Sequence, residues 1–217
     1  MEIIVYFSSI NLIVCLCLER LQTININAEN CINFSMKTLI LGGVRSGKSR
    51  IAEQLALQTA PQKRLIYIAT SMPYDDEMQE RVNEHQAQRA LSAYSWTTIE
   101  EKLYLAQVLA EYSAADTTIL VDCLTLWMTN LLCHADEQLL QSETDALLRQ
   151  LDCIKGQVIF VSNETGLGIV PMEKLSRQFV DKMGLFHQQL AANCDQVSFV
   201  IAGLSVALKP SDLAIEN

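Results

Sequence analysis

Apolar and polar positions follow two different rhythms along residues 36–210. Short, nearly continuous apolar runs are typical of strands buried on both faces, and they predict strands at Thr38–Leu41, Leu65–Ala69, Thr118–Val121, Val158–Val161 and Val197–Ile201. Longer amphipathic segments between them predict helices at Lys48–Gln58, Asp76–Arg89, Glu100–Tyr112, Leu139–Cys153 and Glu173–Ala192. This alternation predicts an α/β fold with a doubly wound, mainly parallel sheet and helices on both faces. Folds of this kind bind ligands beyond the carboxyl ends of the strands.

The N-terminal segment does not follow these rhythms. Ile3–Leu18 is apolar except for three polar residues, but it is short for a membrane span, which needs about 20 apolar residues. No positive residue precedes it, as one would in a secretory signal. A weak membrane anchor, an ordered extra element and an extension ahead of a start at Met36 are all open, and we favour the extension. We therefore expect a single domain at 36–210, an extension at 1–35 outside the fold and a C-terminal tail at 211–217.

Composition and charge narrow the function classes. The chain has 217 residues, of which 50% are hydrophobic, so wholesale disorder is excluded. Sixteen Lys and Arg against 25 Asp and Glu give a net charge of −9, which argues against a general nucleic-acid binder. A phosphate ligand is still compatible with this charge, because a few local cations and backbone N–H groups suffice to bind it.

The loop after the first predicted strand has the pattern of a phosphate-binding loop. Gly42–Ser49 reads GGVRSGKS, which fits G-x-x-x-x-G-K-[ST] between a strand and a helix. Its glycines let successive N–H groups surround a phosphate. Lys48 can neutralise the outer phosphates, the Ser49 hydroxyl can hold Mg²⁺, and Arg45 adds a cation at the tip. The sequence therefore predicts a nucleotide site on a P-loop NTPase-like (RecA-like) sheet.

Three further strand ends carry candidate contacts. Asp122 ends a buried strand and is a candidate Mg²⁺ partner, although it could also cap the next helix. Thr70–Met72 follow another strand and either bind the nucleotide or cap a turn. The loop Ser162–Pro171 contains two glycines and a carboxylate, which suits substrate binding as well as it suits a plain connection.

One predicted helix carries an unusual histidine. Arg81, His85 and Arg89 are four residues apart and share a helix face. The arginines could hold a polyphosphate while neutral His85 attacks a phosphorus atom. From the residues alone, a solvated polar face is the better interpretation. His134 and His187 have no comparable setting, and we expect them at the surface or within helices.

Together the motifs resemble those of the bifunctional adenosylcobinamide kinase / adenosylcobinamide-phosphate guanylyltransferase family of cobalamin biosynthesis. The resemblance covers Met36–Lys209 and rests on GGVRSGKS, IATSMPYDDEM, RVNEHQAQR, WTTIEE, LVDCLTLWMTNLL, VSNETGLGIVP, RQFVDKMG and AGLSVALK. It implies a transferase with two steps. ATP or GTP phosphorylates the aminopropanol hydroxyl of adenosylcobinamide, and GMP from GTP then passes through a covalent GMP–histidine to give adenosylcobinamide-GDP.

The resemblance also implies roles for individual residues. His85 stands where the family carries its GMP, which reverses the preference for a solvated face, and Lys48 acts beside it in catalysis. Ser49 and Asp122 would hold Mg²⁺. The residues that would contact GTP are Gly42, Gly43, Val44, Arg45, Ser46, Gly47, Lys48, Ser49, Thr70, Ser71, Met72, Gln86, Ala87, Gln88, Arg89, Glu100 and Asp122. Gln86 departs from the family, many of whose members have a basic residue there.

Family resemblance further implies a cytoplasmic homo-oligomer, a trimer, with adenosylcobinamide and adenosylcobinamide phosphate as substrates. We expect neither a nucleic-acid partner nor stable membrane association. Two alternatives stay open from the residues themselves. One is a P-loop kinase of a small metabolite without guanylyl transfer, and the other is a regulatory or membrane-tethered nucleotide-binding protein without catalysis.

Overall fold

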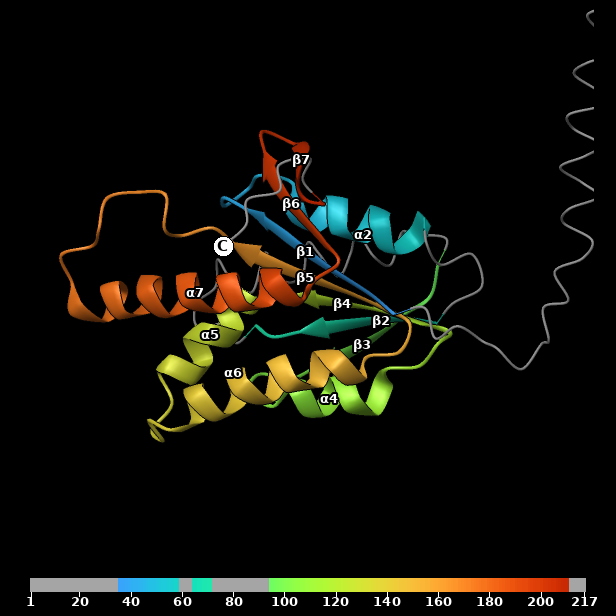
Figure 1. Ribbon diagram of the computed structural model, residues 1–217, viewed down its shortest axis with the longest axis horizontal. Helices are drawn as coiled ribbons and strands as arrows, with labels where there is room; N and C mark the ends of the chain where they lie inside the picture. The colour runs from blue at the N-terminus through green and yellow to red at the C-terminus, as the bar shows by residue number, and fades with distance from the viewer. Residues whose placement is uncertain (1–34, 59–63, 72–93, 211–217) are drawn as a thin grey trace, which may run out of the picture. The chain divides into compact units, whose positions relative to one another are not determined.

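A seven-stranded sheet organises the described part of the chain (Figure 1). The computed structural model describes residues 35–58, 64–71 and 94–210. The strand order is β3-β2-β4-β5-β1-β6-β7, and all neighbours are parallel except β6 and β7. The strands are β1 Met36–Gly42, β2 Arg64–Ala69, β3 Trp96–Glu100, β4 Thr117–Asp122, β5 Gln157–Asn163, β6 Gln196–Ile201 and β7 Leu204–Lys209. The predicted mainly parallel sheet is confirmed.

Helices cover both faces of this sheet, as predicted (Figure 1). On one face, Ala52 and Ala56 of α2 share a buried cluster with Ile40 of β1. On the other face, the larger cluster joins the remaining helices to the strands and includes Trp127 and Phe160. The helices are α2 Lys48–Gln58, α4 Leu105–Tyr112, α5 Leu124–Leu132, α6 Leu139–Gln150 with the 3₁₀ turn η1 Leu151–Cys153, and α7 Lys174–Asn193.

Most of the predicted elements within the described residues are confirmed. All five predicted strands are present with ends shifted by at most two residues, and α2 has the predicted bounds. The helix predicted from Glu100 is wrong at its start, because Glu100 ends β3 and α4 begins at Leu105. Between them the Glu101 carboxylate accepts hydrogen bonds from the N–H groups of Leu103 and Tyr104, at 2.7 and 2.8 Å. This turn separates the strand from the helix.

Two strands and one helix are additional to the predictions. Strands β3 and β7 lie at the two edges of the sheet and have many exposed residues, so their apolar runs are broken. Helix α5 has six buried residues among its nine, and its nearly uniform apolar character hides the helical period.

Parallel alignment brings the ends of the strands to one edge. Gly42 of β1 pairs with Asn163 of β5 in the register of the sheet. Ala69 of β2 pairs with Asp122 on one side and with Glu100 on the other. The phosphate loop, Asp122 and Glu100 therefore lie along the same edge of the sheet.

Some predicted features lie outside the described residues. They are the apolar run Ile3–Leu18, the helix Asp76–Arg89 and the tail 211–217. Within residues 35–58, 64–71 and 94–210, no helix has the length and apolar character needed to cross a membrane.

The buried centre of the sheet predicts a stability test. Leu120 of β4 is fully buried in the cluster beneath α2, so Leu120→Ala should lower the free energy of unfolding by about 2–5 kcal/mol through lost burial and a residual cavity. Leu185→Ala is the control, because Leu185 is 60% exposed on α7, and it should change that energy by no more than about 0.5 kcal/mol. Urea unfolding measures both. Equal effects would contradict this placement of the core.

Candidate functional site

The loop between β1 and α2 has the backbone of an anion-binding turn. Arg45 and Gly47 have φ values of 55° and 93°, in the left-handed region. A Cβ on Gly42 would lie 2.5 Å from the carbonyl oxygen of Val200, so only glycine fits there. Alternating backbone conformations of this kind turn successive N–H groups toward one concavity. The predicted phosphate loop therefore has the local geometry that its motif requires.

Hydrogen bonds fix this loop from inside and from outside. The N–H of Ser46 donates to the carbonyl of Gly43 at 3.2 Å, and the N–H of Ile51 to that of Gly47 at 3.1 Å. The N–H of Gly203, in the turn between β6 and β7, donates to the carbonyl of Ser46 at 2.9 Å. The loop is thus anchored to the neighbouring hairpin as well as to its own helix.

Lys48 is held inside the loop. It is the first residue of α2, its side chain is 8% exposed, and its Nζ donates to the carbonyl of Gly43 at 3.2 Å. Burial lowers the pKa of Lys48, and the negative charge of Asp122 acts in the opposite direction. The charged Lys48 is only partly compensated by Asp122, so binding of a polyanion beside it is favourable. Lys48 is therefore placed to neutralise phosphate oxygens.

Asp122 is oriented by a tyrosine from the next strand. The hydroxyl of Tyr67 donates to Oδ2 of Asp122 at 3.2 Å. The Tyr67 ring meets the ring of Trp96 edge to face, with centroids 6.2 Å apart. Sequence reasoning missed Tyr67, and the only available signal was a hydroxyl in an otherwise apolar strand beside the one that ends in Asp122.

The side chains around the loop fit a triphosphate with Mg²⁺. The Ser49 hydroxyl and the Asp122 carboxylate are hard oxygen ligands, and Mg²⁺ in phosphate sites takes one or two protein oxygens besides phosphate and water. The Ser46 hydroxyl is buried and has no hydrogen-bond partner among the described residues, so it can donate to a phosphate oxygen. In the same part of the chain, no three or more His, Cys, Asp or Glu side chains converge to form a metal site. The arrangement therefore fits Mg²⁺ held jointly with phosphate.

Thr70 joins the ends of β2 and β4. Its hydroxyl donates to the carbonyl of Cys123 at 2.7 Å and accepts from the N–H of Cys123 at 2.9 Å. Its own carbonyl accepts from the Asn130 side chain at 2.9 Å, and its N–H donates to the carbonyl of Asp122 at 3.4 Å. Because the polar groups of Thr70 are engaged, a nucleotide contact by this segment falls to its neighbours, of which only Ser71 is described.

The structure brings together part of the predicted site. Gly42–Ser49, Thr70, Ser71 and Asp122 lie around the ends of β1, β2 and β4. Glu100 is exposed at the end of β3, beyond β2 on the same edge. The other predicted contacts lie outside the described residues: Met72, His85, Gln86, Ala87, Gln88 and Arg89.

A buried hydrogen-bonded chain supports the end of β5. Nε2 of His187 lies 2.8 Å from the Ser162 hydroxyl, which lies 3.3 Å from the Thr125 hydroxyl. The Thr125 hydroxyl accepts from the N–H of Asn163 at 2.7 Å. His187 belongs to helix α7, as one of our two expectations allowed, but it is 8% exposed and so not a surface residue. Its partners are distant in sequence, which explains why sequence reasoning missed this series of hydrogen bonds.

Comparison with known proteins identifies the family. A protein-family model described as cobinamide kinase / cobinamide phosphate guanyltransferase matches residues 38–208, which include the phosphate loop, Asp122 and the loop after β5. The chain belongs to this family. The predicted resemblance is confirmed.

Curated relatives from three bacteria are similar over their full length. The bifunctional adenosylcobalamin biosynthesis protein CobP of Pseudomonas aeruginosa is 49% identical over 178 residues, which cover 82% of this chain and 100% of CobP. CobU of Salmonella typhimurium and CobU of Escherichia coli, both named bifunctional adenosylcobalamin biosynthesis proteins, are 37% and 35% identical over 187 residues, which cover 80% of this chain and 100% of each. Among solved structures, the flagellar accessory protein FlaH of Methanocaldococcus jannaschii is 15% identical, and the match has a TM-score of 0.44. It covers 80% of this chain and 78% of FlaH. This likeness is too distant to bear on function.

The Thr70 contacts predict the effect of a nearly isosteric change. Thr70→Val leaves the buried N–H of Cys123 without its acceptor, so the free energy of unfolding should fall by about 1–3 kcal/mol. Binding of a nucleoside triphosphate should weaken too if Asp122 belongs to its site, because Asp122 directly precedes Cys123. Urea unfolding and titration calorimetry measure the two effects. Thr97→Val, at an exposed position of β3, is the control, and equal stability of the two variants would refute the role of Thr70.

His187 predicts a pH dependence of stability. Burial lowers the pKa of His187, and the charge of Glu164 partly opposes this. As the pH falls below about 6.5, the unfolded chain binds a proton that the folded protein excludes, so the free energy of unfolding should decrease until the lower folded pKa is reached. His187→Gln should flatten this decrease between about pH 7 and 5. Parallel curves for the wild type and His187→Gln would contradict the assignment.

Proposed function

We propose that this protein phosphorylates the aminopropanol hydroxyl of adenosylcobinamide and then transfers GMP from GTP to the product. The result is adenosylcobinamide-GDP, an intermediate of cobalamin biosynthesis. The observation that carries this proposal is the family match over residues 38–208, with CobP aligned over its full length at 49% identity. The geometry of the phosphate loop agrees with both steps, since each step uses a nucleoside triphosphate.

In the first step, the acceptor hydroxyl attacks the γ-phosphorus of ATP or GTP. Backbone N–H groups of Gly42–Ser49 bind the phosphates, and Lys48 and Arg45 neutralise the charge that shifts to the departing diphosphate. Ser49 and Asp122 would hold Mg²⁺, which would supply further charge neutralisation. The buried position of Lys48 supports this role, because an amine in a low-dielectric loop attracts phosphate strongly.

In the second step, we assign His85 as the nucleophile. A neutral imidazole nitrogen attacks the α-phosphorus of GTP, and the bond to pyrophosphate breaks. A phosphate oxygen of adenosylcobinamide phosphate then attacks the same phosphorus, and the phosphorus–nitrogen bond breaks to release the histidine. The spacing of Arg81, His85 and Arg89 in the sequence supports this assignment. Gln86–Arg89, Ser71, Met72 and Glu100 complete the proposed GTP contacts.

The proposed working unit is the domain 36–210, with 1–35 and 211–217 outside it. The bounds of the family match, 38–208, support this division. We further propose a cytoplasmic trimer without a nucleic-acid partner or stable membrane association. Edge strand β7 exposes the apolar side chains of Leu204, Val206 and Leu208, and this exposure supports the proposed self-association.

A nucleotide-transfer assay tests the proposal. GTP labelled at its α-phosphate should give a protein adduct that is labile in acid and stable in alkali, because a phosphoramidate forms at His85. The adduct should be absent from His85→Ala and present in His134→Ala, which removes an exposed histidine elsewhere. Gel autoradiography after each treatment provides the measurement.

Two outcomes would contradict this proposal. A wild-type protein without an adduct, despite kinase activity, would be a P-loop kinase without guanylyl transfer. An adduct that persists in His85→Ala would place the nucleophile elsewhere.

A further inference from the structure

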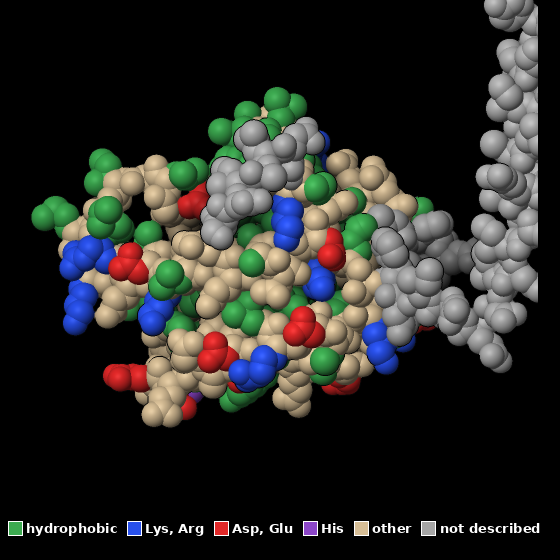
Figure 2. All heavy atoms as spheres, viewed as in Figure 1, with side chains coloured by type: hydrophobic (Ala, Val, Ile, Leu, Met, Phe, Trp, Pro, Cys, Tyr) green, Lys and Arg blue, Asp and Glu red, His purple; other side chains and the backbone are tan. Residues whose placement is uncertain are grey.

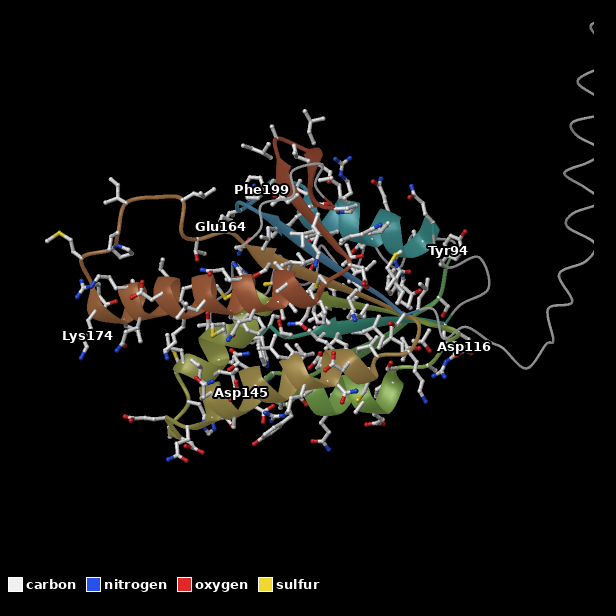
Figure 3. All side chains as sticks on the ribbon, viewed as in Figure 1. Tyr94, Asp116, Asp145, Glu164, Lys174 and Phe199 are labelled. Carbon is white, nitrogen blue, oxygen red and sulfur yellow. The ribbon has the colours of Figure 1, made fainter. Side chains whose placement is uncertain are left out.

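A pocket of about 360 Å³ opens beside the phosphate loop. Gly43–Ser46 of the loop line one side. Glu164 and Leu167, from the segment after β5, and Phe199–Ala202, from β6 and its turn, line the rest. Figure 3 shows Glu164 and Phe199 at this end of the sheet. The pocket therefore adjoins the loop proposed to bind phosphates but consists mainly of residues without an assigned role.

This pocket lies across β1 from the other nucleotide contacts. Asp122 and Glu100 end β4 and β3, which lie on the β5 side of β1. Val200 of β6 pairs with Gly42 from the opposite side. A molecule in the pocket would therefore reach the phosphate loop from the side of β1 opposite to Asp122 and Glu100. Such a position suits the second reactant of a transfer reaction.

The mouth of the pocket is apolar and exposed. Val44, Leu167 and Ile201 line it and are 67%, 79% and 59% exposed. Ile169 and Val170 continue the apolar surface along the same loop, at 98% and 71% exposure. Figure 2 shows hydrophobic side chains gathered over the loop after β5 and over the β6–β7 hairpin. A contiguous exposed apolar patch beside a polar site indicates a surface for a ligand or partner.

Cobinamide has the two-part chemistry that this surface would recognise. Its corrin ring is broad and carries methyl groups and amides, and one amide bears a short aminopropanol arm with a hydroxyl. The pocket lies at the small end of ligand-binding cavities, so it can admit the arm but not the ring. The apolar mouth offers a support for the ring outside.

Glu164 is the acidic group of this pocket. Its N–H donates to the carbonyl of Gly42 at 3.1 Å, which ties it to the start of the phosphate loop. One carboxylate oxygen accepts from the N–H of Gly166, and the other makes no hydrogen bond with a described residue. The carboxylate is thus fixed by its own loop while one oxygen is available to a hydroxyl.

We propose that this pocket receives the aminopropanol arm of cobinamide, with its hydroxyl on Glu164 and the corrin ring on the apolar mouth. The inference rests on the proposed kinase function. The hydroxyl oxygen bonds to the γ-phosphorus, the bond from that phosphorus to the bridging oxygen breaks, and the electron pair leaves with the nucleoside diphosphate. The proton of the hydroxyl passes to Glu164.

Steady-state kinetics of cobinamide phosphorylation tests the pocket. Leu167→Asp places a charge at the mouth and should raise the KM for cobinamide about tenfold or more, with the KM for the triphosphate changed by less than about twofold. Leu185→Asp is the matched control, because Leu185 is similarly exposed but lies on α7 away from the lining, and it should behave as wild type.

Glu164→Gln tests the proton acceptor separately. Glutamine keeps an oxygen for the N–H of Gly166, so the loop should retain its form. The kcat of phosphorylation should fall about 100-fold, with both KM values little changed. Glu137→Gln, at an exposed residue before α6, is the control and should keep the wild-type kcat.

Several results would overturn the pocket assignment. In Leu167→Asp, a raised KM for the triphosphate instead of for cobinamide would do so. An altered oligomeric mass of that variant, together with normal cobinamide kinetics, would also do so. Wild-type kinetics of both Leu167→Asp and Glu164→Gln is the third such result. The labelled-GTP adduct should form normally in Leu167→Asp and Glu164→Gln, since it needs no cobinamide. Failure of the adduct in the wild type would therefore count against the guanylyl-transfer proposal, while the phosphorylation kinetics would still decide the pocket.

Discussion

The parallel arrangement of β1, β2, β4 and β5 is the constraint on which the rest of the structure depends. Parallel neighbours must be joined by crossovers that cover the faces of the sheet, and all their carboxyl ends then share one edge. Gly42, Asp122 and Asn163 reach that edge on three different strands. The site is therefore assembled from residues far apart in the chain, and the buried strands behind them fix its geometry.

Local patterns predicted the parts of this structure that local physics determines. Continuous apolar runs identified the central strands, and GGVRSGKS identified the phosphate loop with the start of α2. Edge strand β3 was missed because Thr97 and Thr98 interrupt its apolar run, and α5 because burial all round removes its polar face. No one-dimensional pattern reports such contacts as Tyr67 with Asp122 or Thr70 with Cys123, which are separated by 55 and 53 residues.

The proposed polyphosphate site of this acidic protein depends on local arrangement rather than on total charge. The net charge of −9 is spread over the chain, whereas Arg45 and Lys48 are concentrated in one loop with its backbone N–H groups. Lys48 is also largely buried. Salt and solvent therefore screen its charge less than they would screen a charge at the surface. The position of Asp122 also depends on local contacts, because the Tyr67 hydroxyl and the hydrogen bonds of Thr70 hold the end of β4 in place.

The hydrogen bond from Gly203 to Ser46 has a mechanical meaning. It ties the centre of the phosphate loop to the hairpin of β6 and β7, whose outer strand exposes an apolar edge. Because of this hydrogen bond, the position of Ser46 depends on the position of the turn between β6 and β7. A contact or substitution that displaces the turn at Gly203 would therefore also displace the carbonyl of Ser46 in the phosphate loop.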